Sequence, residues 1–177
     1  MGDVVPKEVG AYYASFPEEG RLASGSSRLE FERTKEILAR VLPEAPARVV
    51  DVGGAAGAYS AWLAERGYEV HLVDAAPRLV EEARRRNARL AKPIASLSVG
   101  DARRLPQGDG SADAVLVMGP LYHLTAAEDR LAALREARRV LVPGGTVVVA
   151  AISRYASALD MAAALEDAAG SIAPALK

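Results

Sequence analysis

The sequence predicts an α/β fold, a doubly wound parallel sheet with helices on both faces. From residue 48 to residue 152, short apolar runs rich in β-branched residues alternate with segments of helical composition. The apolar runs read as strands buried on both faces, which is typical of parallel sheets covered by helices. Because crossovers between parallel strands are right-handed, a doubly wound sheet is the simplest arrangement. The length of 177 residues favours one domain.

The elements follow one another in strict alternation. Strands are expected at 48–52, 69–73, 95–99, 113–118 and 145–152. Helices are expected between them at 58–66, 77–91 and 128–141. Gly67 suits the C-terminal cap of the first of these helices, and Pro77 suits the first turn of the second. Glycines 144 and 145 are best explained by a turn before the last strand.

The two ends of the chain are less regular. Residues 1–28 read as an irregular segment or a short helix plus loop, and an amphipathic helix follows at 29–42, where Pro43 stops the pattern. Residues 154–170 can form one helix before a tail. We therefore expect three parts: an N-terminal cap segment and first helix (1–47), a core (48–153), and a C-terminal helix and tail (154–177).

Composition excludes several classes of function. Half of the residues are hydrophobic, a quarter are charged and the formal net charge is −1, so no global field favours nucleic acid or an anionic membrane. The absence of cysteine removes disulfides and thiolate chemistry. No apolar stretch approaches the ~20 residues that span a bilayer, and the N-terminus has no signal-peptide core. A cytoplasmic location is the default expectation.

The most informative stretch is RVVDVGGAAG, residues 48–57, which links the first core strand to the following helix. Glycines there allow a sharp turn and a close approach of backbone to a ligand. Asp51 lies at the end of the strand, at the crevice where open parallel sheets bind ligands. A dinucleotide-binding fingerprint would need glycine at positions 53, 55 and 58. This chain has Gly53, Ala55 and Ala58, so only the first position fits. This mismatch disfavours an NAD-dependent oxidoreductase.

A loop of the form acid-x-Gly-x-x-x-Gly is present instead, made by Asp51, Gly53 and Gly57. Four further segments follow in order: VHLVD, which ends at Asp74, then VGDARRLP, MGPLYHL and LREARRVLVPGGTVVVA. With this loop and these segments, residues 48–153 of the chain resemble the class I S-adenosylmethionine-dependent methyltransferases. GPLYHL with the later ISRYAS is suggestive of a group of bacterial small-molecule methyltransferases. The family's middle loop glycine is Ala55 here, which either avoids positive φ or accepts a small strain.

The resemblance implies a Rossmann-like sheet of order 3-2-1-4-5, and the short C-terminal remainder predicts that the usual strands six and seven are lacking. Strand five would then be an unprotected apolar edge. Either a second copy of the chain covers this edge in a homodimer, or the sequence is a shortened version of a longer protein.

S-adenosylmethionine is the implied cofactor, with S-adenosylhomocysteine as its product. By resemblance, Asp74 accepts hydrogen bonds from the ribose hydroxyls, Asp101 meets the adenine amino group, and the backbone around Ala102 meets the ring edge. The implied cofactor-binding set is Asp51, Gly53, Gly54, Ala55, Gly57, Asp74, Ala75, Asp101, Ala102, Met118 and Gly119. Each carboxylate alone could be a turn or cap residue. Three at successive strand ends jointly favour a ligand.

The implied reaction is methyl transfer to a small-molecule acceptor by in-line displacement, in which positioning supplies most of the catalysis. His123 is the candidate general base because it follows strand four at the crevice and titrates near neutrality. Tyr122 is the candidate for positioning the acceptor. A structural role for His123 remains the alternative. Tyr12, Tyr13 and Arg21 are candidates for a lid, and packing is their alternative.

No metal is implied, because two isolated histidines do not make a ligand cluster. The main alternative to the enzyme is a non-catalytic module that binds S-adenosylmethionine or S-adenosylhomocysteine, or a partner, and has lost acceptor binding with the missing strands. The sequence does not encode a recognisable acceptor pocket.

Overall fold

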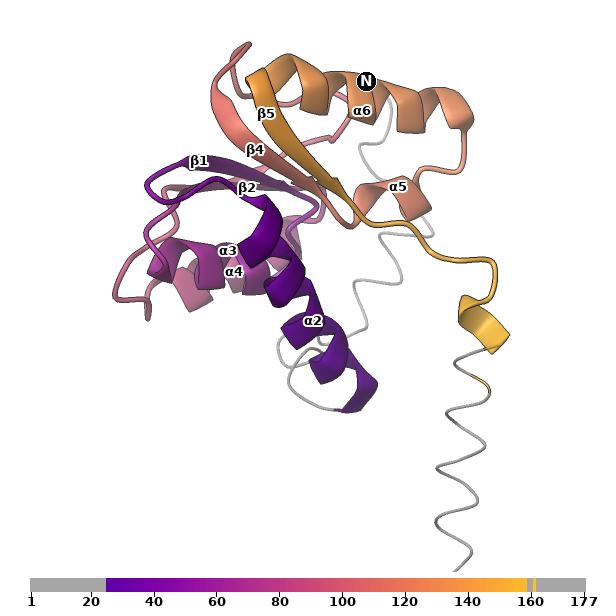
Figure 1. Ribbon diagram of the computed structural model, residues 1–177, viewed down its shortest axis with the longest axis horizontal. Helices are drawn as coiled ribbons and strands as arrows, with labels where there is room; N and C mark the ends of the chain where they lie inside the picture. Colours follow the sequence, from indigo (N-terminus) through magenta and orange to yellow (C-terminus); the bar gives the residue numbers. More distant parts are fainter. Residues whose placement is uncertain (1–24, 159–160, 162–177) are drawn as a thin grey trace, which may run out of the picture.

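A five-stranded parallel sheet forms the centre of the molecule (Figure 1). The computed structural model describes residues 25–158 and 161. Its strands are β1 (Arg48–Val52), β2 (Glu69–Asp74), β3 (Ser96–Val99), β4 (Ala112–Val117) and β5 (Leu141–Val149). Their order is β3-β2-β1-β4-β5, and every neighbouring pair is parallel. The predicted Rossmann-like order is confirmed.

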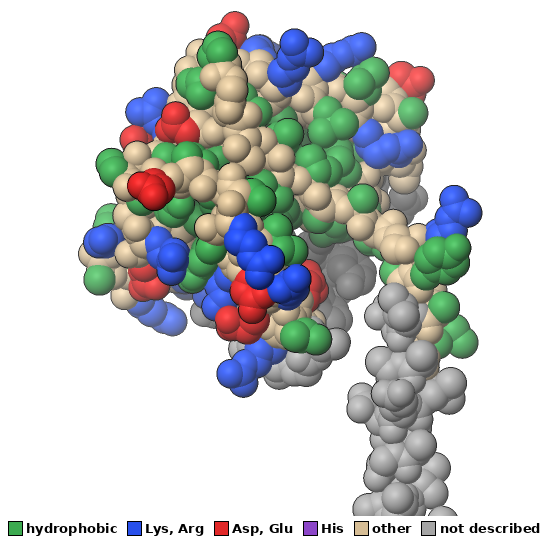
Figure 2. Space-filling model, viewed as in Figure 1, with side chains coloured by type: hydrophobic (Ala, Val, Ile, Leu, Met, Phe, Trp, Pro, Cys, Tyr) green, Lys and Arg blue, Asp and Glu red, His purple; other side chains and the backbone are tan. Residues whose placement is uncertain are grey.

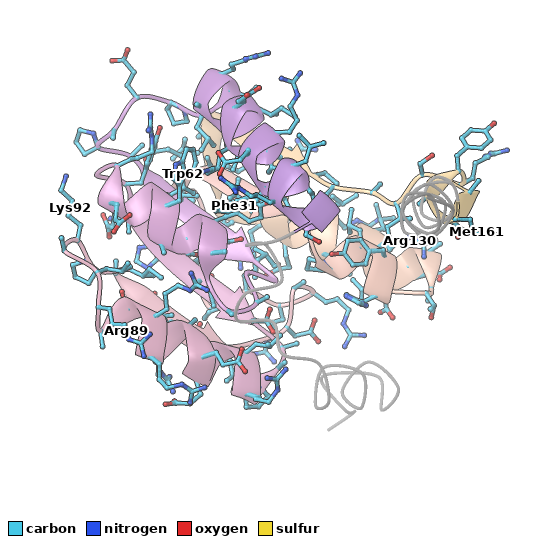
Figure 3. The ribbon with its side chains drawn as sticks, turned by 90° about the horizontal axis from the view of Figure 1, so that it is seen from below. Phe31, Trp62, Arg89, Lys92, Arg130 and Met161 are labelled. Carbon is cyan, nitrogen blue, oxygen red and sulfur yellow. The ribbon has the colours of Figure 1, made fainter. Side chains whose placement is uncertain are left out.

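Helices cover both faces of the sheet (Figure 1). One face packs against α2 (Gly25–Val41), α3 (Ala58–Glu65) and α4 (Pro77–Asn87), and the other against α6 (Ala127–Val140). A short helix, α5 (Pro120–His123), lies at the end of β4. Aromatic side chains join α2 to α3: the Phe31 ring lies 5.0 Å from that of Tyr59, and Figure 3 shows Phe31 and Trp62 on these two helices.

The strands bury alternate residues on opposite faces. Val49, Leu72 and Leu116 pack with Leu38, Leu63 and Val80 from the three helices of the first face. Val50, Val73 and Val115 pack with Ala137 and Val140 of α6. Each fully buried side chain of this size contributes roughly 1.5–3 kcal/mol through removal of its apolar surface from water. The two cores fix the strand ends from which the candidate site is built.

Two local predictions for helix ends are confirmed. Gly67 follows α3 with φ +97°, the left-handed conformation that ends many helices. Pro77 is the first residue of α4, where its missing N–H has no helical acceptor to lose. Gly67 and Pro77 thus lie on either side of β2, whose last residue is Asp74.

Other boundaries differ from the sequence prediction. β5 begins at Leu141, directly after α6, because the Pro143–Gly145 segment forms an irregular part of the strand and not a turn before it. The register there changes from Ala112↔Leu141 to Ala114↔Thr146. Gly144 has φ +82°, which glycine adopts without strain. α4 ends at Asn87, four residues before the predicted end, and α5 was not predicted.

β5 forms one edge of the sheet, as predicted. Val147 and Val149 are 46% and 43% exposed, and Figure 2 shows hydrophobic side chains at the surface along this strand. The predicted irregular segment with Tyr12, Tyr13 and Arg21 lies outside the described residues, as does most of the predicted helix at 154–170. Of the helices that the structure describes, none combines the length and apolar character needed to cross a membrane.

Candidate functional site

Three carboxylates lie at the same end of three neighbouring strands. Asp51 is the next-to-last residue of β1, Asp74 ends β2, and Asp101 follows β3. These strands are adjacent and parallel, so their carboxyl ends meet at one edge. The backbone N–H of Gly100 donates to the Asp74 carbonyl at 2.9 Å, which draws the β3 end toward β2. The structure thus brings together the three acids that the sequence singled out.

Asp51 is buried beneath the glycine loop. Only 2% of the residue is exposed, and its Oδ2 accepts a hydrogen bond of 2.6 Å from Ser60 Oγ of α3. Burial raises the pKa of Asp51 to about 6; the Ser60 hydrogen bond lowers it and the charge of Asp74 raises it further. A Cβ on Gly54 would lie 2.8 Å from this Oδ2. Glycine at position 54 therefore lets the loop close over the carboxylate.

Asp74 holds the same loop from the other side. Its Oδ2 accepts from the Ala55 backbone N–H and its Oδ1 from that of Ala76, both at 2.8 Å. Ala55 has φ +48°, so of the two possibilities at this position the chain adopts the strained one. The Asp74 carboxylate compensates by binding the strained peptide directly.

The glycine loop packs backbone to backbone against the segment after β4. Gly53, with φ +71°, would place a Cβ only 2.6 Å from Pro120 Cδ, and a Cβ on Gly119 would lie 3.0 Å from the Gly53 carbonyl oxygen. The N–H of Gly53 donates to the Val73 carbonyl at 2.7 Å. Neither loop has room for a side chain at this contact, so the glycine loop and α5 are placed relative to each other by their backbones.

Tyr122 and His123 lie on α5, beside this contact. Their ring centroids are 4.7 Å apart, and Tyr122 is 42% exposed. Burial lowers the pKa of His123, against the opposing effect of the negative charge of Asp74. The imidazole is therefore mainly neutral at pH 7 and lies within electrostatic range of Asp74. Arg130 donates to the Leu124 and Thr125 carbonyls, each at 2.7 Å, and holds the end of α5 (Figure 3).

Asp101 is bound by an arginine two residues later. Its carboxylate accepts from the backbone N–H of Arg103 and from the guanidinium, whose Nη2 lies 2.6 Å from Oδ2. Burial works to raise the pKa of Asp101, but the Arg103 hydrogen bonds hold it below its ordinary range. Arg103 also reaches Asp129 at 3.0 Å, in the first turn of α6.

The remaining predicted residues lie at the same end of the sheet. Met118 is partly buried against the core of the α2–α4 face, and Ala102 is partly buried against the α6 face. Ala75 connects Asp74 to α4, and Gly57 starts α3 with φ +74°. Among the described residues, no group of three histidine and acidic side chains is arranged to hold a metal ion.

Sequence reasoning missed three contributors to this site: Ser60, Arg103 and Pro120. Ser60 gave no signal, because a serine in a helix is unremarkable without knowledge of what it faces. Pro120 follows Gly119 within a motif already noted. The sequence DARR places an arginine two residues after Asp101. Because a guanidinium can donate two parallel hydrogen bonds to a carboxylate, this spacing is the signal that could have identified Arg103.

A family model described as a methyltransferase domain matches residues 49–145, which include the glycine loop, all three carboxylates and α5. The chain belongs to this methyltransferase family. The match confirms the resemblance to class I S-adenosylmethionine-dependent methyltransferases drawn from the sequence.

Curated relatives carry the same kind of name. The demethylmenaquinone methyltransferase of Beutenbergia cavernae is 40% identical over 106 residues, which cover 60% of this chain and 41% of that protein. The ubiquinone biosynthesis O-methyltransferase of Xanthomonas campestris is 32% identical over 150 residues, covering 84% of this chain and 59% of that protein. The chain thus spans about half the length of these curated relatives.

Among solved structures, the PH0226 protein of Pyrococcus horikoshii matches with a TM-score of 0.69 and 27% identity. The match covers 78% of this chain and 64% of that one. The similarity supports the Rossmann-like fold described above.

Proposed function

We propose that this chain binds S-adenosylmethionine and transfers its methyl group to a small-molecule acceptor, as an enzyme of the EC 2.1.1 type. The observation that carries the proposal is the set of three carboxylates at adjacent strand ends around a glycine loop, in a chain of the methyltransferase family. The two curated relatives are named for demethylmenaquinone and for ubiquinone biosynthesis, which supports a small-molecule acceptor. A cytoplasmic location is part of the proposal.

The residues present fit this cofactor. Asp74 ends β2 with a carboxylate, and the two oxygens of a carboxylate suit the paired hydroxyls of a ribose as hydrogen-bond donors. Gly54 leaves room for the loop over Asp51, whose charge favours the cationic amino group of the cofactor. Asp101 would accept from the adenine amino group, and the Ala102 backbone would meet the ring. The rest of the cofactor site would be lined by Gly53, Gly57, Ala75, Met118 and Gly119.

When bound, S-adenosylmethionine supplies a methyl group that its sulfonium already activates. The chain's own task is then to orient an acceptor, and good orientation supplies roughly 7–11 kcal/mol of the barrier reduction. His123 would take the proton of an acceptor hydroxyl or acidic carbon, because its lowered pKa keeps Nδ1 or Nε2 unprotonated at pH 7. Tyr122, exposed beside it, would position the acceptor.

A second candidate function is a non-catalytic module that binds S-adenosylmethionine or S-adenosylhomocysteine. The observation that favours it is that the three strand-end carboxylates and the glycine loop would serve cofactor binding alone, without a contribution from Tyr122 or His123. We also propose that a second copy of the chain covers the β5 edge in a homodimer, because Val147 and Val149 are exposed there.

The cofactor proposal is tested by calorimetry with S-adenosylmethionine, S-adenosylhomocysteine and NAD. We expect both sulfur nucleotides to bind and NAD not to bind. Asp74→Asn should weaken binding at least tenfold, since a hydrogen bond to a charged group contributes about 1.5–3 kcal/mol. Asp109→Asn is the matched control, because that side chain is 83% exposed and far along the chain from the loop. Wild-type affinity in Asp74→Asn would refute the ribose assignment.

Turnover separates the enzyme from the module. Incubation of a metabolite extract with S-adenosylmethionine labelled in its methyl group should transfer label, and Asp51→Ala should abolish the transfer. Cofactor binding without any transferred label would favour the module instead.

A further inference from the structure

Arg103 occupies most of the acceptor capacity of Asp101. Oδ1 accepts from the Arg103 backbone N–H at 2.8 Å and from Nε at 3.0 Å. Oδ2 accepts from Nε at 3.0 Å and from Nη2 at 2.6 Å. The single Nε–H is shared between the two oxygens, so three N–H groups of Arg103 take up most of the roughly four acceptor sites of the carboxylate. A further donor at Asp101 therefore meets the guanidinium at the same two oxygens and binds best when the guanidinium gives up a contact.

The guanidinium has a second anchor that does not depend on Asp101. Its Nη1 lies 3.0 Å from Oδ1 of Asp129, a residue in the first turn of α6. Both acids raise the pKa of Arg103, so its charge is permanent. The side chain of Arg103 is 31% exposed and that of Asp101 is 23% exposed, so the pair lies at the surface of the crevice where solvent or a ligand can exchange with it.

We infer that Arg103 competes with the 6-amino group of the adenine base for Asp101, and that Asp129 holds the guanidinium when the base displaces it. The inference rests on the proposed function, which assigns Asp101 to the adenine amino group. Arg103 is then a specificity-determining residue: it weakens the one contact that distinguishes a 6-amino purine from other purines.

Two substitutions should shift affinity in opposite directions. Arg103→Met removes the guanidinium but keeps the backbone N–H that orients Oδ1 of Asp101. Affinity for S-adenosylhomocysteine should therefore rise by about three- to tenfold. A fully buried hydrogen bond to a charged group would give a larger change, but the Arg103–Asp101 pair is partly exposed and solvent reduces the effect. Asp129→Asn weakens the alternative anchor, because it removes the negative charge and one acceptor oxygen. Arg103 is then held more closely by Asp101, and the affinity should fall severalfold.

The decisive ligand is the 6-deamino analogue of S-adenosylhomocysteine, in which hydrogen replaces the amino group. It has no donor to compete for Asp101, so Arg103→Met should leave its affinity within about twofold of wild type. Arg104→Met is the matched control, since the neighbouring arginine is exposed and its removal also takes one positive charge from this segment. Calorimetry on the full chain measures all these affinities.

The outcomes separate this inference from the proposed function. If wild type and variants all fail to bind S-adenosylhomocysteine, the proposed function is wrong. If wild type binds but Arg103→Met binds more weakly, Arg103 orients Asp101 and does not compete, and the inference is overturned. It is also overturned if Arg103→Met improves both ligands equally, or if Asp129→Asn and Arg103→Met shift affinity in the same direction.

Discussion

Asp74 binds the backbone N–H of Ala55 across 2.8 Å and so holds an alanine in the left-handed conformation, with φ +48°. Left-handed backbone costs an L-residue about 1–2 kcal/mol. A hydrogen bond to a charged acceptor is worth about 1.5–3 kcal/mol, which is enough to offset that cost. The carboxylate proposed to bind the ribose is thus also the group that keeps the cofactor loop in shape.

Ala55→Gly should stabilise the protein, because glycine adopts positive φ without strain. The gain should be on the order of 0.5–1 kcal/mol, since the relief of strain is partly offset by the larger freedom of glycine in the unfolded chain. Urea unfolding measures it. Ala56→Gly is the matched control: Ala56 is buried and lies outside the left-handed region, so that substitution should destabilise. Equal destabilisation by both would refute the strain at position 55.

Asp51→Asn should change how stability depends on pH. The pKa of Asp51 is about 6 in the folded protein, whereas an aspartate in the unfolded chain has the ordinary value of 3.8. Between these values the folded state binds more protons than the unfolded state, so the stability that Asp51 contributes is present below pH 3.8 and is lost as pH rises through 6. The loss is on the order of 3 kcal/mol, from about 1.4 kcal/mol per pKa unit.

The asparagine variant does not ionise, and its amide oxygen can still accept from Ser60. Urea unfolding of both proteins from pH 4.5 to pH 8 should show an advantage of Asp51→Asn that grows with pH and levels off above about pH 7. A pH-independent difference between the two proteins would show that Asp51 does not titrate as described.

Gly53→Ala should disturb both the loop and α5. The substitution places alanine at φ +71° and a Cβ 2.6 Å from Pro120 Cδ. Gly110→Ala is the matched control, with φ +56° but nothing within 4 Å. Both should lose about 1–2 kcal/mol from backbone strain, and Gly53→Ala about 1–3 kcal/mol more from overpacking. Urea unfolding and the NMR signal of His123 report the two effects; equal losses would mean that Pro120 yields without cost.

His123→Gln should remove a pH dependence if the proposed general base acts. The pKa of His123 is lowered by burial, so the rate should rise as pH increases through a value below 6.5 and be flat at pH 7. Loss of the base should lower kcat by roughly 10²–10⁴-fold. His71→Gln is the control, because His71 lies on β2 between Ser96 and Glu69 and should leave the profile unchanged. An unaltered profile in His123→Gln would assign the histidine a structural role.

The parallel sheet and the strand-end positions of Asp51, Asp74 and Asp101 could be predicted from the alternation of buried strands with helices, and the strand order came from the family resemblance. The start of β5 could not be predicted, because Pro143–Gly145 carries the residues of a turn and only the pairing of Leu141 and Thr146 with β4 shows that the strand runs through this segment. The roles of Arg103 and Ser60 could not be predicted for a related reason. Their roles depend on which atoms face one another across separate segments, and spacing along the chain does not encode that.

The contact between Gly53, Gly119 and Pro120 also limits how such a protein can diversify. Because no side chain fits between the two loops, neither can be altered to suit a new acceptor without moving the other. Under the proposed function, we therefore expect new acceptor preferences to arise from Leu121 onward or from segments outside the sheet, while the contact between the two loops stays the same. Redesign of this chain for another acceptor should accordingly randomise positions 121–126 and leave residues 53, 119 and 120 untouched.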